Sequence, residues 1–325
     1  MRSEQLWPRW PRAYPGTGII GKLKQSAEDF AVTELAEPQG DPGGEHLYVY
    51  LEKRCVSTPV VAERIANSLG VGRAEVGYAG MKDFKAVTRQ WFSAPVAESP
   101  DIDYGEGVQE LRRLRCAKKL RRGQLDGNEF DIRLTDIALK DTAALDERLA
   151  TLAEVGTPNY FGPQRFGRDN LTQALAWLPF RRRERNGFRR GLHLSVLRSF
   201  LFNEVLAARV QQDSWQRCLP GEPQCSLVPQ PTGSFSPQPT GSFSPQPTGS
   251  FSPQPTGPLW GRGRTLAGAE VADLEQVALE EHAELLEELE FTGLTQARRG
   301  LVLRPQGLEW TLADRTLQLL SLIHI

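Results

Sequence analysis

Residues 77–93 carry the sequence GYAGMKDFKAVTRQWFS, in which small residues lead into a charged cluster. Gly77, Ala79 and Gly80 allow the backbone to approach another group closely. Asp83 then stands between two lysines. Because nearby cations favour an ionised carboxylate, Asp83 suits a nucleophile or a base better than a general acid. An aspartate beside a lysine is also common in surface turns, so this pattern alone does not assign chemistry.

The segments around this stretch alternate between strand and helix patterns. Residues 47–51 alternate apolar and polar side chains, which predicts a half-buried strand. Ser57-Thr58-Pro59 predicts the start of a helix, and Gly70 predicts its C-terminal cap. We also expect strands over residues 87–92 and 130–134, and a helix from Asp141 to near Gly156. These patterns together predict an α/β or α+β scaffold.

A second region begins near Thr157. We expect helices over about residues 195–210 and 270–290 and strands over residues 300–304 and 308–312. The helix over residues 270–290 contains nine acidic residues and no lysine or arginine, and the simplest interpretation is a solvated face.

An octapeptide, PQPTGSFS, is repeated between these two helices. It starts at Pro229, Pro237 and Pro245 and begins a fourth time at Pro253. Proline and glycine at this density do not support a packed element, so we expect an extended, mobile loop over residues 229–257. The regularly spaced phenylalanines allow an alternative interpretation as a stacking platform, but duplication of a short surface loop is simpler.

The composition narrows the function classes. The 325 residues suggest two domains at roughly 150 residues each, and the net charge is −1. No apolar run is long enough to span a membrane, and the N-terminus lacks the apolar stretch of a signal peptide. The four cysteines form no CxxC pair and the four histidines are scattered. We therefore expect a cytoplasmic protein without a metal site.

Positive charge is concentrated in two segments. Residues 111–125 and 181–190 are rich in arginine and lysine, and the first segment has no acidic residue. Such clusters on a neutral protein predict contact with a nucleic-acid backbone, although solvated basic loops are the alternative. The candidate backbone contacts are Arg112, Arg113, Lys118, Lys119, Arg121, Arg122, Arg181, Arg182 and Arg183.

The residues around Asp83 fit the pattern GxKDxxAxTxQ, and other motifs follow in order along residues 16–319. They are Glu28-Asp29-Phe30, the stretch GQLDGNEF at residues 123–130, PNYFGPQRFG at 158–167, SFLFN at 199–203 and QARR at 296–299. With these motifs the sequence resembles the TruD family of tRNA pseudouridine synthases. The resemblance implies a pseudouridine-synthase-like catalytic domain with a mixed or antiparallel sheet, and an inserted α/β domain.

The resemblance also implies a reaction and its residues. The family isomerises uridine 13 of tRNA to pseudouridine without a metal or redox cofactor. Asp83 would be the nucleophile or base, and Lys24 would pair with it. Phe30 would stack on the uracil, with Asn128 and Phe130 as further substrate contacts. The alternatives are that Phe30 and Phe130 are core residues, that Asn128 is a turn residue and that Lys24 is a surface lysine. Four further motif residues either contact RNA or hold the domain junction together: Asn159, Tyr160, Gln164 and Arg165.

The expected catalytic domain comprises residues 1–156 and 306–325, and the expected inserted domain comprises residues 157–305. Residues 320–325 depart from the family pattern, so we expect a truncated or frame-shifted C-terminus with reduced stability and activity. A monomer is expected. The rival functions are a non-catalytic protein that binds and remodels tRNA and, less favoured, an N-glycoside hydrolase that would release free uracil.

Overall fold

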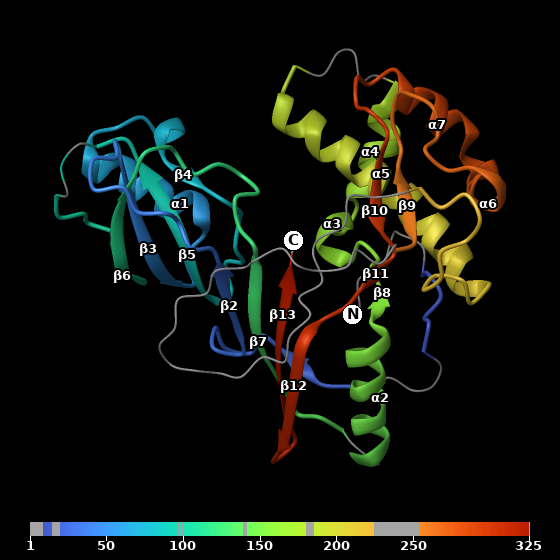
Figure 1. Cartoon of the computed structure of the whole chain (residues 1–325), viewed down its shortest axis with the longest axis horizontal. Helices are drawn as coiled ribbons and strands as arrows, with labels where there is room; N and C mark the ends of the chain where they lie inside the picture. The colour runs from blue at the N-terminus through green and yellow to red at the C-terminus, as the bar shows by residue number, and fades with distance from the viewer. Residues whose placement is uncertain are drawn as a thin grey trace. The chain divides into compact units, whose positions relative to one another are not determined.

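The computed structural model describes residues 9–14, 20–96, 98, 100–138, 142–179, 185–223 and 254–324 (Figure 1). The chain forms two compact units. One contains residues 17–154 and 305–325 and is called the sheet unit below. The other contains residues 1–16 and 155–304 and is called the helical unit. Each unit is therefore assembled from segments that are distant in the sequence.

Within the described residues, nine strands of the sheet unit form one mixed sheet. The main order is β12 (Gln306–Ala313), β13 (Thr316–His324), β7 (Gly127–Thr135), β2 (Phe30–Leu35), β5 (Val87–Ala94), β3 (His46–Arg54) and β6 (Val108–Cys116). β1 (Lys22–Leu23) pairs with β7, and β4 (Gly77–Tyr78) pairs with β5. The pairing of β2 with β5 is parallel and the other pairings are antiparallel.

Helix α1 (Thr58–Leu69) packs its apolar face against this sheet, as its spacing of apolar residues predicts. Proline stands in its first turn, and Gly70 ends it in the left-handed conformation with φ of 66°. Leu51 and Phe92 are fully buried in the resulting core. After the short 3-10 helix η1 (Arg73–Glu75), the chain enters β4 and then the Asp83 loop.

Helix α2 (Thr142–Val155) covers the other end of the sheet. Leu145 and Leu149 of the helix are buried against Leu317 of β13, and Trp310 of β12 donates a hydrogen bond to Asp146. Residues 320–324, which belong to the segment that departs from the family pattern, lie in this hairpin. Leu320 pairs with Asp131, and the register continues to the pairing of residue 324 with Gly127. These residues therefore complete the strand next to β7.

The helical unit is built around the long helix α5 (Gly187–Gln211). It packs with α4 (Asn170–Trp177), α6 (Ala269–Leu279) and α7 (Ala283–Glu290) around a core that includes Leu197 and Leu201. The remaining elements are α3 (Pro163–Phe166), η3 (Glu280–His282), the pair β9 (Thr256–Leu259) and β10 (Ala297–Gly300), and the pair β8 (Thr157–Pro158) and β11 (Val302–Leu303).

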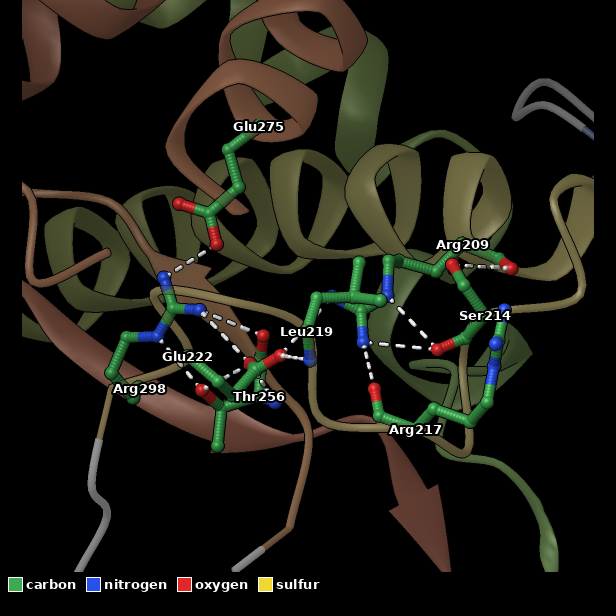
Figure 2. A network of polar contacts seen from close by, with 8 residues as sticks. All are labelled: Arg209, Ser214, Arg217, Leu219, Glu222, Thr256, Glu275 and Arg298. Atoms are coloured by element: carbon green, nitrogen blue, oxygen red, sulfur yellow. Dashed lines mark hydrogen bonds and ion pairs between the residues drawn. The ribbon is translucent and has the colours of Figure 1, made fainter. Parts of the chain in front are cut away.

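A buried network of charges joins the parts of the helical unit (Figure 2). Arg298 lies 2.6 Å from Glu275 and donates hydrogen bonds to the hydroxyl and carbonyl oxygens of Thr256. Glu222 accepts from the Thr256 amide at 2.7 Å and lies 3.2 Å from Arg209. Burial raises the pKa of the Glu275 carboxyl, and Arg298 partly opposes this effect. Figure 2 shows Arg298 held between the two glutamates.

Four sequence predictions for this unit need correction. The strand expected over residues 300–304 is divided between β10, which ends at Gly300, and β11, which spans residues 302–303. The helix expected over residues 195–210 begins earlier, at Gly187, with Asn186 as a side-chain cap. The acidic segment expected as one helix over residues 270–290 is two helices, α6 and α7, joined by η3. Its acidic character is also not uniformly a solvated face, because Glu275 is buried. The predictions for residues 229–253, for Asp141 and for Arg181, Arg182 and Arg183 lie outside the described residues. The mobile loop expected over residues 229–257 does not extend to its predicted end, because Thr256 and Gly257 are buried in β9.

Candidate active site

Asp83 lies in the loop between β4 and β5, and its carboxylate is paired with Lys24. The Lys24 Nζ is 2.8 Å from the Asp83 Oδ2, across 59 positions of sequence. The two side chains are 26% and 31% exposed, so the pair is accessible from solvent but partly shielded by protein. The predicted pairing of Lys24 with Asp83 is therefore present in the geometry. It fixes an ionised carboxylate at the surface of the sheet unit.

Phe30, the first residue of β2, lies directly beside this ion pair. The Lys24 Nζ is 3.7 Å from the centroid of the Phe30 ring, which is close enough for a cation–π interaction. The Phe130 ring on β7 meets the Phe30 ring edge-on, with centroids 6.2 Å apart. A base that stacks on Phe30 therefore uses the ring face away from the ammonium or displaces the ammonium.

The turn from Lys24 to Asp29 sets the position of both the lysine and the ring. Lys24 has φ of 56°, a left-handed backbone conformation that a non-glycine residue adopts at some energetic cost. Asp29 is buried, and its carboxylate accepts a hydrogen bond from the Ser26 amide. The carbonyl of Asp29 accepts from the Arg133 amide on β7. The aspartate of the Glu28-Asp29-Phe30 motif thus closes the turn that presents Phe30.

The lysine that precedes Asp83 in sequence has a different role. The Lys82 Nζ lies 2.9 Å from Glu34 of β2, and both side chains are buried. Burial raises the pKa of the Glu34 carboxyl, while Lys82 acts in the opposite direction. Glu34 also accepts a hydrogen bond from the Trp91 amide. This pair therefore ties the Asp83 loop to the middle of the sheet.

Gln90 and Thr58 secure the start of the same loop. The Gln90 side-chain amide donates to the Gly80 carbonyl at 3.0 Å, and its oxygen accepts from the Thr58 hydroxyl. The Thr58 hydroxyl in turn accepts from the Lys82 amide. Gln90 therefore supports the start of the loop through both ends of its side-chain amide. Thr88 is fully buried, and its hydroxyl has no hydrogen-bond partner among the described residues.

Lys53 is a third lysine at this loop, and no sequence motif pointed to it. It is 1% exposed, and its ammonium donates to the carbonyl oxygens of Val56 at 2.8 Å and Asp83 at 3.1 Å. Burial lowers the pKa of Lys53 to about 8, with Asp83 opposing and Lys82 reinforcing the shift. Lys53 therefore holds the backbone of Asp83 while Lys24 holds its side chain.

The sequence contains a signal for the buried positions of Lys53 and Glu34, of which only Lys53 lies outside the family motifs. Lys53 follows Leu47, Val49 and Leu51 at intervals of two, so it occupies the buried face of the same strand. Glu34 likewise follows Phe30 and Val32 at the same interval, which places it on the face of β2 that carries Phe30. A charged residue at an inward position of a strand indicates a buried partner.

Asn128 lies on β7 opposite Glu34 of β2, on the same sheet face as Phe130 and Phe30. It is 7% exposed, and its side-chain oxygen has no hydrogen-bond partner in the described part of the chain. Buried amide oxygens are rarely left without a donor. The free acceptor of Asn128 is therefore suited to an N–H group of a substrate.

The residues predicted to contact a nucleic-acid backbone lie on β6 and in the turn after it, and they differ in their surroundings. Arg113 is engaged by two hydrogen bonds to Glu110, which makes it a poor candidate for RNA contact. Arg112 is exposed and forms a surface ion pair with Glu37. The other four cations in this group follow β6, and three of them are exposed: Lys118, Arg121 and Arg122, with Lys119 half-buried.

The PNYFG motif at residues 158–162 makes its contacts within the helical unit. Asn159 donates to the Gly300 carbonyl and accepts from Arg299, and the Arg299 guanidinium lies 4.2 Å from the Phe161 ring centroid. The Asn203 side chain pairs with both the amide and the carbonyl of Phe161. These contacts join β8, β10 and α5, and they give the motif a structural role.

Comparison with known proteins agrees with this geometry. A profile of the family "tRNA pseudouridine synthase D (TruD)" matches residues 12–176. The tRNA pseudouridine synthase D of Chromohalobacter salexigens is 40% identical over 317 residues, covering 94% of this chain and 89% of the relative. The chain belongs to the TruD family. The tRNA pseudouridine synthase D of Pseudomonas fluorescens is likewise 40% identical, over 92% of this chain and 86% of the relative.

A solved structure shares the fold. The crystal structure of a protein from Methanosarcina mazei assigned as a tRNA pseudouridine synthase D superimposes with a TM-score of 0.68. The match covers 98% of this chain and 93% of that protein at 19% sequence identity. A second profile, for a domain of unknown function, matches residues 208–276, a range that contains the octapeptide repeats.

The described part of the chain lacks two features. None of the helices there is both long and apolar enough to cross a bilayer. Among the same residues, no three or more histidine, cysteine, aspartate or glutamate side chains are grouped as metal ligands would be.

Proposed function

We propose that this protein isomerises a uridine of tRNA to pseudouridine, at position 13 as the family resemblance implies, in the cytoplasm. The sheet unit is the pseudouridine-synthase-like catalytic domain in this proposal, and the helical unit contains the inserted domain. The observation that carries the proposal is the Lys24–Asp83 ion pair, 2.8 Å long, beside the Phe30 ring. It combines an ionised carboxylate with an aromatic surface for a base.

The reaction makes three demands on the site. The N1–C1′ bond of the uridine breaks, the uracil turns, and a C5–C1′ bond forms while C5 loses its proton and N1 takes up one. The target nucleotide must first be flipped out of its helix or loop, which costs a few kcal/mol. The reacting atoms must then face a carboxylate that stays ionised as water is excluded.

The site residues match these demands. Lys24 neutralises and orients Asp83, and a paired charge is far less costly to desolvate than an isolated one. Lys53 and Lys82 fix the loop backbone on either side of that carboxylate. Phe30 and Phe130 supply aromatic surface, and the free oxygen of Asn128 accepts from the uracil edge. Each role follows from a contact of this chain's own residues.

The test is tritium release from tRNA that carries [5-³H]uridine. Asp83→Asn keeps the shape of the side chain but removes its charge, so we expect release to fall by about 10²- to 10⁴-fold or more. The affinity for tRNA should remain within about threefold of the wild type. Asp131→Asn is the matched control, because Asp131 alternates with Phe130 on β7 and lies on the other face of the sheet.

Three outcomes separate this proposal from its rivals. Release that vanishes in Asp83→Asn but persists in Asp131→Asn supports the isomerase. Binding of tRNA without release in any of the proteins would overturn it in favour of a non-catalytic tRNA-binding protein. Free uracil among the products would indicate N-glycoside hydrolysis instead. Mapping pseudouridines in the treated tRNA then tests the assignment to position 13.

A further inference from the structure

A cavity of the sheet unit lies beside the strand that leads into the Asp83 loop. It has a volume of about 520 Å³ and is formed by η1, β4 and the turn after β6. The residues that line it include four cations, Arg73, Lys119, Arg121 and Arg122, and no acidic residue. Its size falls within the range of sites that bind small organic ligands.

The cavity has an aromatic wall whose neighbours are positively charged. The guanidinium carbons of Arg73 and Arg122 lie 5.6 Å and 5.9 Å from the centroid of the Tyr78 ring. The Phe92 ring lies against Tyr78, with the two ring centroids 6.1 Å apart. Guanidinium groups stacked on a ring are pre-oriented, and their planar N–H groups match the oxygens of a phosphate.

The surrounding backbone keeps these groups in place. Lys119 donates to the Ala74 carbonyl at 2.6 Å, which links the turn after β6 to η1. Gly77 has no room for a side chain, because a Cβ there would lie 2.2 Å from the Leu120 carbonyl oxygen. The nearest acid in sequence, Glu75, is turned to the Gly72 amide. All the charged side chains that line the cavity are thus cationic.

The geometry points to a binding site for one unpaired nucleotide of the RNA, separate from the target uridine. Its phosphate binds Arg73 and Arg122, and its base stacks on Tyr78 in place of one of these guanidinium groups. Stacking on an aromatic ring combined with cations along the backbone is how proteins bind single-stranded nucleic acid. The site rests on the proposed function, because it supplies a second point of contact for the same tRNA substrate.

The position of the cavity links it to the chemistry. β4 ends at Tyr78, and the chain continues through Gly80 to Asp83. The Ala79 carbonyl accepts from the Gly123 amide, so the basic turn is attached to the start of the catalytic loop. A nucleotide held here therefore fixes the RNA strand relative to that loop without touching the reacting atoms.

The experiment compares Arg73→Gln, Arg122→Gln, Tyr78→Leu and Tyr78→Phe in the full chain. Each arginine variant should reduce the slope of log affinity against log salt by about one. Tyr78→Leu should weaken tRNA binding by about tenfold without changing that slope, and Tyr78→Phe should bind as the wild type does.

Arg133→Gln is the matched control for charge, since Arg133 is exposed on β7 and does not line the cavity. An oligoriboadenylate is the second probe, because it contains no uridine and reports the cavity even if the isomerase proposal fails. We expect it to bind the wild type and Arg133→Gln but to bind Arg122→Gln at least about fivefold more weakly. Equal binding by all of these proteins would overturn the site. Arg122 is exposed, so its substitution leaves the fold intact.

Discussion

At the scale of single residues, Lys53 links the stability of the protein to pH. An unfolded lysine has a pKa of about 10.4, whereas burial lowers the pKa of Lys53 to about 8 in the folded chain. Between these values the unfolded chain binds a proton that the folded chain has released. The contribution of Lys53 to the unfolding free energy therefore rises with pH through that window. Below about pH 8 the lysine is charged in both states, so the folded chain bears the full cost of burying the charge.

We predict that Lys53→Met removes this dependence. The difference in unfolding free energy between wild type and variant should grow by about 1–3 kcal/mol from pH 8 to pH 10 in favour of the wild type. Urea denaturation at several pH values measures it. Lys85→Met serves as the control, since Lys85 is exposed on the same loop. A difference that does not vary with pH would show that Lys53 is not the titrating group.

The single residues of the candidate site also show how much of it the sequence predicts. The motif around Asp83 and its family resemblance indicated Lys24, Phe30, Asn128 and Phe130. The structure places Lys24 on Asp83, Phe30 beside them, and Phe130 against Phe30. Composition and periodicity alone do not predict the Lys24–Asp83 pair, because the strand pairings between β1, β7 and β2 create it. Whether these side chains contact substrate stays a prediction.

At the scale of elements, periodicity predicted some strands and helices and missed others, including β6 and β13. The alternation over residues 47–51 lies within β3, and Gly70 ends α1 as predicted. The parallel pairing of β2 with β5 has no local signal, because it depends on which strands meet after α1 has crossed the sheet. The N-terminal extension of α5 was missed because its first turns carry arginine and glycine instead of an apolar stripe.

The contact between the Asp83 loop and β2 gives a prediction at this scale. Glu34→Gln keeps the hydrogen bond to the Trp91 amide but leaves the buried Lys82 ammonium without a counter-charge. We expect a loss of about 3–5 kcal/mol in unfolding free energy, measured by denaturant titration. Glu34→Gln combined with Lys82→Met should recover much of it, since no buried charge is then left alone. Additive losses in the double variant would contradict this coupling.

At the scale of the whole molecule, the octapeptide repeats are bounded by two anchored residues. Glu222 precedes them, and Thr256 belongs to the fourth, incomplete copy. The two are joined by hydrogen bonds from the Thr256 amide and hydroxyl to the Glu222 carboxylate. Arg209 and Arg298 hold the same carboxylate within the buried network of Figure 2. The chain is thus fixed at both ends of the repeats by contacts that do not involve residues 229–253.

We therefore predict that the number of repeats has little effect on stability. Deleting residues 229–244 removes two copies and roughly halves the segment between Glu222 and Thr256 while leaving the sequence around Thr256 unchanged. For the mobile loop that the sequence predicts, closing half the length is easier by about 0.6 kcal/mol, so the melting temperature should stay the same or rise slightly. Glu222→Gln should instead destabilise the protein, because it leaves buried Arg209 and Arg298 short of a counter-charge. Calorimetry on both variants compares the two effects. A deletion that costs more than the Glu222 substitution would show that the repeats pack against the protein, and would contradict their interpretation as a duplicated surface loop.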